Sequence, residues 1–198
     1  MKFIDKKTIQ IDKDINELDR LVIKFIRILE KHTIYVIVSG YVAILLGRSR
    51  TTEDVDIFIQ ELSKENFRKL YTDLQNSGFW CLNGENVAEL YEYLIEGLAV
   101  RFALENQTIP NFEVKFARKL LDKESFNDTL TAITKIGKIR ISSLERQIAF
   151  KRYFLKSDKD IEDASHIEKL FKKNIDNRRV YEYKKMIENE AAKTRKRQ

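Results

Sequence analysis

Two aspartates, Asp54 and Asp56, lie two residues apart in an otherwise apolar run that ends at Ile59. We expect this run to form a β-strand, and because side chains alternate between the two faces of a strand, both carboxylates project from the same face. Two neighbouring carboxylates repel each other unless a cation lies between them. Carboxylate oxygens with no Cys or His nearby favour Mg²⁺ or Mn²⁺ over zinc. The pair predicts a divalent-metal site or, if it binds no cation, a solvated strand end.

A candidate phosphate-binding turn precedes the two aspartates in the chain. The β-branched run from Ile34 to Val38 predicts a strand that is buried on both faces. The run ends at Ser39 and Gly40, where a short helix is expected to begin. The N-terminus of a helix presents unpaired N–H groups, and glycine lets the backbone approach a phosphate closely. A Ser-Gly pair is also common in ordinary turns, so the prediction depends on its place one strand before the aspartates.

The stretch from residue 35 to 59, YVIVSGYVAILLGRSRTTEDVDIFI, resembles the signature of the nucleotidyltransferase superfamily. That signature is an apolar strand, a Gly-Gly or Gly-Ser pair, and acid-apolar-acid on the next strand. The Gly40-Tyr41 pair and the Arg50-Thr51-Thr52 run are similar to small prokaryotic nucleotidyltransferase-like proteins, which include toxins of abortive-infection type. The resemblance implies an α/β (α+β) fold with a mixed sheet flanked by helices and a C-terminal helical extension. It also implies a set of nucleotide-binding residues: Ser39, Gly40, Arg50, Thr52 and Lys151.

The same resemblance implies a third carboxylate on a later strand. Glu113 matches by position, on the second strand of an antiparallel hairpin that we expect over 98–104 and 112–116. The family more commonly has Asp at this place. Ala103 is the other position that an alignment could choose, and the third acid would then be absent. With Glu113 in the role, the catalytic and metal-binding set is Asp54, Asp56 and Glu113.

Lys151 is predicted to lie within the apolar stripe of a helix. Ser142 and Glu145 form a capping-box pattern that predicts the start of this helix at Ser142. An ammonium group in such a stripe extends to solvent, pairs with an acid, or binds an anion such as a nucleotide phosphate. The segment 136–167 resembles the helical extension of the family. The acids that begin its next helix, Asp160 and Asp163, are interpreted as structural partners of the helix dipole.

The 198 residues predict one α/β core over 1–141 and a helical region over 142–198. Residues 172–198 contain ten Lys or Arg and four Asp or Glu, so this segment carries the whole net charge of +6. Such a tail is either a solvated helix or a surface for RNA phosphates. The single Cys81, the charged N-terminus and the short apolar runs predict a cytoplasmic protein with no membrane span.

Three functions agree with these patterns. The first is an Mg²⁺- or Mn²⁺-dependent enzyme that moves a nucleotidyl group from a nucleoside triphosphate to a hydroxyl of RNA, protein or a small molecule and releases pyrophosphate. The second is a non-catalytic nucleotide- or RNA-binding protein of a toxin-antitoxin system. The third is a metal-dependent nuclease, because Glu113 and Lys115 form the acid-x-Lys pattern of restriction-type endonucleases. Asp56 and Glu113 are 57 residues apart, which is long for that pattern.

Overall fold

The computed structural model describes residues 1–195. In chain order the strands are β1 (Lys2–Asp5), β2 (Thr8–Gln10), β3 (Tyr35–Ile37), β4 (Asp54–Ile59), β5 (Phe79–Cys81), β6 (Val100–Leu104), β7 (Asn111–Phe116), β8 (Thr129–Thr134) and β9 (Gly137–Ser142). The helices are α1 (Glu17–Leu29), α2 (Ser39–Leu45), α3 (Lys64–Asn76), α4 (Val87–Glu96), α5 (Leu120–Asn127), α6 (Leu144–Phe150), α7 (Asp158–Leu170) and α8 (Asn177–Arg195). A π-helical segment, Lys151–Leu155, follows α6 directly.

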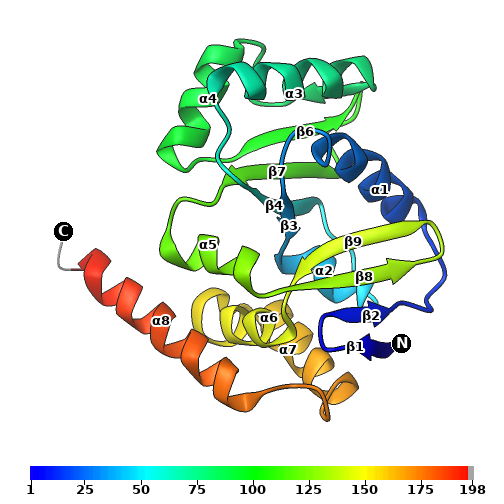
Figure 1. Cartoon of the computed structure of the whole chain (residues 1–198), viewed down its shortest axis with the longest axis vertical. Coiled ribbons are helices and arrows are strands. Elements are labelled where there is room, and N and C mark those ends of the chain that lie inside the picture. Colours follow the sequence, from blue (N-terminus) through cyan, green and yellow to red (C-terminus); the bar gives the residue numbers. More distant parts are fainter. Residues whose placement is uncertain (196–198) are drawn as a thin grey trace.

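All nine of these strands form one mixed sheet in the order β1-β2-β8-β9-β3-β4-β7-β6-β5. The central strand β4 pairs antiparallel with β3 and parallel with β7. Figure 1 shows α3 and α4 near β6 and β7, and α6, α7 and α8 at the opposite end of the molecule. The expected α/β fold with a mixed sheet, flanking helices and a helical C-terminal part is confirmed.

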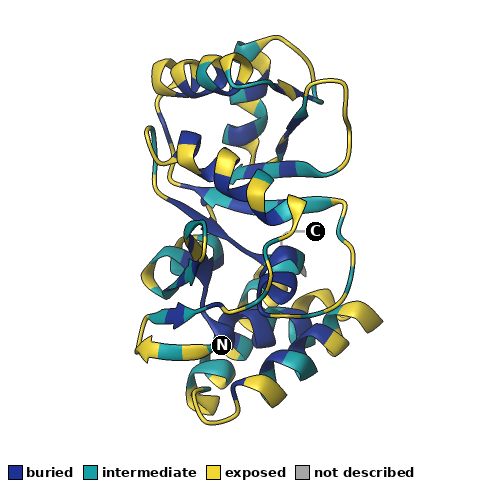
Figure 2. Ribbon diagram, turned by 90° about the vertical axis from the view of Figure 1, so that its right-hand side faces the viewer, coloured by how far each residue is buried: buried dark blue, intermediate teal, exposed yellow. Residues whose placement is uncertain are grey.

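One face of the central strands is apolar and forms the main core. In β4 the residues that alternate with the aspartates, Val55, Ile57 and Ile59, are almost completely buried. Helix α1 covers this face, and the ring of its Phe25 stacks on Phe112 of β7 with a centroid distance of 3.9 Å. In Figure 2 the helices are buried on the side that faces the sheet and exposed on the other. The apolar face therefore fixes β4 and β7, and their polar residues project from the other face.

The structure corrects the expected start of α6. Ser143, and not Ser142, is the N-cap residue, and its hydroxyl accepts a hydrogen bond from the N–H of Arg146 at 3.2 Å. Ser142 is the last residue of β9 and lies next to the side chain of Gln147. The sequence patterns also did not predict β1, β2, α5 or β8. Strand β8 contains a clear alternation, because Leu130, Ala132 and Thr134 are buried and Thr129, Thr131 and Ile133 are less so.

The basic C-terminal helix α8 packs against the rest of the chain along one side. Tyr183 and Ile187 are buried together with Leu121 and Ala149. The solvated helix expected here is therefore packed on one face, while Arg178, Lys185 and Lys193 are exposed on the other; residues 196–198 of the predicted basic tail lie outside the described residues. No helix within residues 1–195 has both the length and the apolar composition needed to cross a membrane. The division into 1–141 and 142–198 stays a prediction.

Candidate active site

The strand register places the three predicted acids on one face of the sheet. Asp56 of β4 is directly opposite Glu113 of β7, and Asp54 is opposite Asn111. Because β4 and β7 are parallel neighbours, the Asp56 and Glu113 side chains project from the same side. Ala103 lies one strand farther away, on β6, opposite Asn111. Glu113 is thus the residue that the fold places beside Asp56.

Two cations surround Glu113. Its Oε1 accepts a hydrogen bond from Arg101 Nε at 2.6 Å, and its Oε2 accepts one from Lys115 Nζ at 3.2 Å. The Lys115 ammonium is also 3.9 Å from Asp56 Oδ1. Burial raises the pKa of Glu113, but Arg101 and Lys115 outweigh burial, so that its pKa lies below the usual value. Glu113 is therefore ionised at neutral pH.

Asp56 has the opposite shift. Burial, together with the charges of Asp54 and Glu113, raises its pKa from 3.8 to about 6, although Lys115 and a hydrogen bond from Ser39 act against this rise. The side chain of Asp56 is 26% exposed, so one side of the carboxylate remains accessible. An accessible carboxylate with a raised pKa and acidic neighbours is typical of a functional site.

The turn after β3 lies beside the aspartates, because β3 and β4 are neighbours and the Val38 N–H donates to the Asp56 carbonyl at 3.0 Å. Ser39 has a φ of 59°, a left-handed conformation that is unusual for serine. A Cβ atom on Gly40 would lie 3.2 Å from both Arg50 Nη2 and Thr52 Oγ1, so this position has little room for a side chain. Thr52 in turn donates to the Asp54 carbonyl at 3.0 Å, and its Oγ1 is 3.2 Å from Asp54 Oδ1. Three predicted nucleotide-binding residues, Gly40, Arg50 and Thr52, thus lie close together beside Asp54.

Arg50 and Lys151, both predicted to bind nucleotide, lie on the same buried acid in this structure. Asp163 Oδ2 accepts hydrogen bonds from Arg50 Nη1 at 2.7 Å and from Lys151 Nζ at 2.9 Å. Arg48 Nε is 3.4 Å from the other oxygen of Asp163, and Lys151 also bonds Asp160 at 3.3 Å. Lys151 is 1% exposed and Asp163 is completely buried. Through Arg50, which lies beside Gly40, this network connects α7 to the start of α2.

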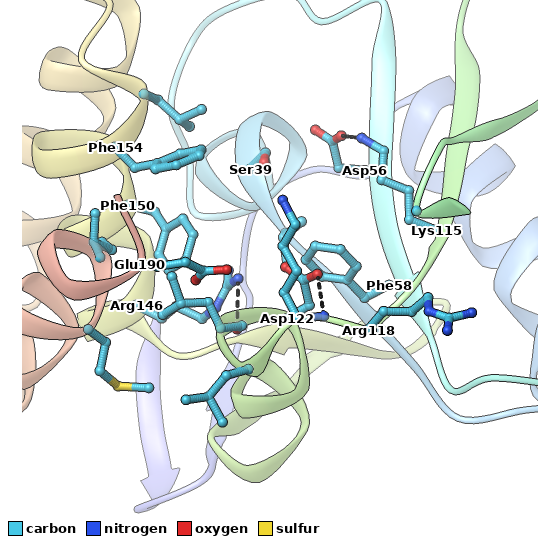
Figure 3. A pocket seen from close by; sticks show the side chains of 18 of the residues that line it. Ser39, Asp56, Phe58, Lys115, Arg118, Asp122, Arg146, Phe150, Phe154 and Glu190 are labelled. Atoms are coloured by element: carbon cyan, nitrogen blue, oxygen red, sulfur yellow. Dashed lines mark hydrogen bonds and ion pairs between the residues drawn. The ribbon is translucent and has the colours of Figure 1, made fainter. Parts of the chain in front are cut away.

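A cavity of about 1160 Å³ lies between the polar face of β4 and β7 and the C-terminal helices. Ser39, Asp56 and Lys115 line one part of it, and Arg146 and Phe150 line another. Figure 3 shows Phe150, Glu190 and Arg146 across the cavity from Asp56 and Lys115. Lys151 also lines the cavity. The cavity is large enough for a nucleotide or a ligand of similar size.

No family model and no curated protein matches the sequence. Solved structures match it at low identity. The solution structure of the antibiotic-resistance factor ANT(2'')-Ia has a TM-score of 0.59 and 14% identity, over 90% of this chain and 95% of that one. The crystal structure of ANT(2")-Ia in complex with adenylyl-2"-tobramycin has a TM-score of 0.56 and 14% identity, over 87% and 97%. An antigenic nucleotidyltransferase-like protein from Paracoccidioides brasiliensis has a TM-score of 0.52 and 19% identity, over 76% and 75%.

This chain has the nucleotidyltransferase fold. In this nucleotidyltransferase fold, one buried residue that the sequence patterns did not single out contacts the turn after β3. The Gln147 amide of α6, in the orientation that satisfies its neighbours, accepts from the Ser39 N–H at 3.1 Å and donates to the Ser39 carbonyl at 3.3 Å. It also accepts from the Ser142 hydroxyl at 2.6 Å. A glutamine at a buried position within an apolar helix face was the only sequence signal for this contact.

We expect Gln147→Ala to loosen the turn at Ser39. The substitution leaves the N–H of Ser39 without its acceptor, whereas the Ser39 carbonyl keeps its hydrogen bond within α2, and one buried unpaired group costs about 1–3 kcal/mol. The free energy of unfolding should fall by about that amount in a urea titration, and nucleotide affinity should fall with it. Gln107→Ala, at an exposed position, is the matched control. If Gln147→Ala and Gln107→Ala have equal effects, Gln147 does not hold the turn.

Proposed function

We propose that this chain transfers a nucleotidyl group from a nucleoside triphosphate to an acceptor hydroxyl. The observation that carries the proposal is the position of Asp54 and Asp56, on a strand beside the Ser39-Gly40 turn, in a nucleotidyltransferase fold. The raised pKa of Asp56 supports it, because the shift arises from burial and from the neighbouring carboxylates. Nucleoside triphosphates and Mg²⁺ are abundant in the cytoplasm, which is the location that we propose.

In the proposed reaction the acceptor hydroxyl oxygen forms a bond to the α-phosphorus, and the bond from that phosphorus to pyrophosphate breaks. The hydroxyl proton passes to solvent or to a carboxylate of the site. Ser39 and Gly40 would bind the terminal phosphates, with Arg50, Thr52 and Lys151 as further nucleotide-binding residues. Each of these groups contributes by positioning and charge neutralisation, which supply most of the catalysis in phosphoryl and nucleotidyl transfer.

Two of the three carboxylates near the Ser39-Gly40 turn suit Mg²⁺ or Mn²⁺ as ligands. Asp54 and Asp56 provide hard oxygen donors, and a divalent cation bound there would neutralise the phosphates and orient them for attack. Glu113 would be the third ligand, but in this structure its oxygens bond Arg101 and Lys115. Accordingly, no group of three acidic, His or Cys side chains in residues 1–195 is close enough to hold a metal. A third ligand therefore requires that Glu113 exchange one of its ion pairs.

The test is a transfer assay with each of the four α-labelled nucleoside triphosphates, Mg²⁺ and, as acceptors, total RNA, a protein lysate and tobramycin. Tobramycin is included because the adenylylated compound is bound by the ANT(2")-Ia neighbour. Label should appear on one acceptor, depend on Mg²⁺ or Mn²⁺, and disappear in Asp56→Asn. Release of labelled pyrophosphate from a γ-labelled nucleotide should match the transfer. Mg²⁺-dependent binding of a nucleotide without any transfer would contradict the proposal.

The ion pairs of Glu113 favour one alternative, a non-catalytic nucleotide- or RNA-binding protein of a toxin-antitoxin type. A third acid that is neutralised by Arg101 and Lys115 is a poorer metal ligand.

The nuclease hypothesis is supported by the short distances from Lys115 to Asp56 and Glu113. It gives no role to the Ser39-Gly40 turn. RNA cleavage in the transfer assay, without label on any acceptor, would support it.

The basic C-terminal segment, which includes α8 and the residues just before it, gives a prediction for an RNA acceptor. Lys172, Lys173 and Lys185 are exposed, whereas Arg179 is paired with Glu124. Each phosphate contact with single-stranded RNA contributes about 0.7 to the slope of log affinity against log salt. The triple Lys→Gln variant at the three exposed positions should therefore lower the slope by about 2.

The matched control changes the same charge at the N-terminus, where Lys2, Lys6 and Lys7 are also exposed. Binding of a single-stranded RNA would be measured at two salt concentrations for both variants. If the two variants lower the slope equally, the salt dependence reflects net charge and not a site in the C-terminal segment. If neither variant changes it, the C-terminal lysines do not bind RNA phosphates.

A further inference from the structure

Arg146 is a buried cation in the wall of the cavity. It lies on α6 and is 3% exposed, yet it lines the same cavity as Asp56 and Ser39. Its guanidinium lies over the ring of Phe150 at 3.9 Å and near the ring of Phe58 at 5.8 Å. Two aromatic rings hold the guanidinium plane in place, which is the arrangement of a preformed site for a planar or forked ligand.

This guanidinium has little polar compensation from the protein. Its Nε has no hydrogen-bond partner within the described part of the chain, and Nη2 reaches only the Leu121 carbonyl, at 3.5 Å. Asp122 and Asp128 act on it only through their charges, and burial still lowers its pKa to about 10. Arg146 is therefore charged at neutral pH. A buried charge without a hydrogen-bonded counter-ion is costly, and a bound anion would remove that cost.

The cavity around Arg146 carries more cations than acids among the described residues. The basic residues that line it are Lys115, Arg118, Lys119, Arg146, Lys151 and Lys193, and the acidic ones are Asp56, Glu96, Asp122 and Glu190. Asp122 has a backbone partner, because its Oδ2 accepts from the N–H of Lys119 at 3.3 Å. Lys115, Arg118 and Lys151 have acidic partners, so among the described lining residues Arg146 is the buried cation without an ion pair, and it favours an anionic ligand over a polyamine.

The position of Arg146 separates it from the predicted triphosphate site. Phe58, which its guanidinium contacts, follows Asp56 by two residues on the same face of β4, about 6–7 Å along the strand. The triphosphate is expected on the other side of Asp56, at Asp54 and at the turn of Ser39 and Gly40. A ligand that reaches both Asp56 and Arg146 therefore lies on the side of Asp56 opposite the triphosphate. This is the side on which we expect the acceptor.

We propose that Arg146 binds a phosphate group of the acceptor and so selects a phosphate-bearing acceptor for the transfer reaction. This inference rests on the proposed function, because it assigns the second substrate of that same site. The guanidinium fork matches a phosphate through two parallel hydrogen bonds, and Phe150 keeps the fork in its plane. Arg118 and Lys119 at the cavity add attraction without direct contact.

The experiment measures the melting temperature with inorganic phosphate against sodium chloride of equal ionic strength, with and without a saturating Mg²⁺-nucleotide. Wild-type protein should show a phosphate shift that adds to the nucleotide shift. Arg146→Gln should weaken phosphate about 10- to 100-fold, because hydrogen bonds to a charged group contribute that much. Arg146→Lys keeps the charge and loses the fork, so it should also bind phosphate more weakly. Arg20→Gln, at an exposed position of α1, is the matched control and should behave as wild type.

The outcomes separate this inference from the proposed function. A nucleotide shift that Arg146→Gln retains, with a phosphate shift that it loses, supports the acceptor site. A phosphate shift that survives in Arg146→Gln, or no phosphate shift in the wild type, overturns it. Joint loss of both shifts, or competition between phosphate and nucleotide, would overturn it too, because Arg146 would then belong to the nucleotide site. Absence of any nucleotide shift would instead contradict the proposed function.

Discussion

Replacing Asp56 with Asn is expected to reduce nucleotidyl transfer by about 10²–10³-fold or more and, at pH 7.5, to increase the free energy of unfolding. The loss of activity follows from the loss of a charged group at the reacting phosphate. The gain in stability follows from the raised pKa of Asp56, since the ionised carboxylate is unfavourable in the folded state. Opposite changes in activity and stability are typical of a functional residue.

The pH dependence gives the sign and the size of the stability gain. The pKa of Asp56 is about 6 in the folded protein and close to 3.8 when unfolded. Between these values the folded state binds more protons, so the contribution of Asp56 to stability is greatest at low pH and is lost as the pH rises through 6. Two pKa units correspond to about 3 kcal/mol. Asp56→Asn should therefore be more stable than the wild type by about 2–3 kcal/mol at pH 7.5, and this difference should disappear near pH 4.

Urea unfolding at several pH values measures this difference. Asp14→Asn changes an exposed acid and should leave both the activity and the pH profile unchanged. Asp54→Asn should also reduce transfer, and it should lower the pKa of Asp56 because it removes one repelling charge. If Asp54→Asn and Asp56→Asn both unfold more easily at neutral pH, the two acids are structural and the proposed function loses its main support.

Replacing Asp163 with Asn is expected to have the largest effect on stability, a loss of about 3–5 kcal/mol, which is the usual cost of removing one partner from a buried ion pair. Asp163 is completely buried and bonds both Arg50 and Lys151, which is itself 1% exposed. The substitution leaves Lys151 with Asp160 as its remaining acid. Because Arg50 lies against Gly40, the loss of this network should also weaken nucleotide binding.

The neighbouring residue is the matched control for Asp163. Glu162 precedes it on α7 and pairs with Arg48, but its side chain is 64% exposed. Glu162→Gln should therefore cost about 1 kcal/mol or less in urea unfolding. Similar losses for the two variants would show that burial of Asp163 does not determine the strength of the network. Lys151→Met tests the same network from the other side, and a decrease in nucleotide affinity larger than that of Asp163→Asn would favour direct contact with phosphate.

Local patterns in the sequence determined the elements that carry the acids. The alternation in Asp54–Ile59 predicted a strand with both aspartates on one face, and β4 has these bounds. The apolar run before Ser39 predicted β3, and the capping-box pattern of Ser142 and Glu145 predicted the helix that begins one residue later. These features follow from the sequence because side-chain periodicity and helix capping involve residues only a few positions apart.

Only the tertiary structure decided what surrounds each charged group. The register of β4, β7 and β6 places Asp56, Glu113 and Arg101 side by side, although they are far apart in the chain. The packing of α6 brings Gln147 to Ser39 and leaves Arg146 buried beside the cavity. The sequence left solvent, an acid or a bound anion as alternatives for Lys151, and only the packing of α7 showed that Asp163 is its partner. Strand register and helix packing depend on the summed burial of many apolar side chains, and no local pattern encodes the polar contacts that result.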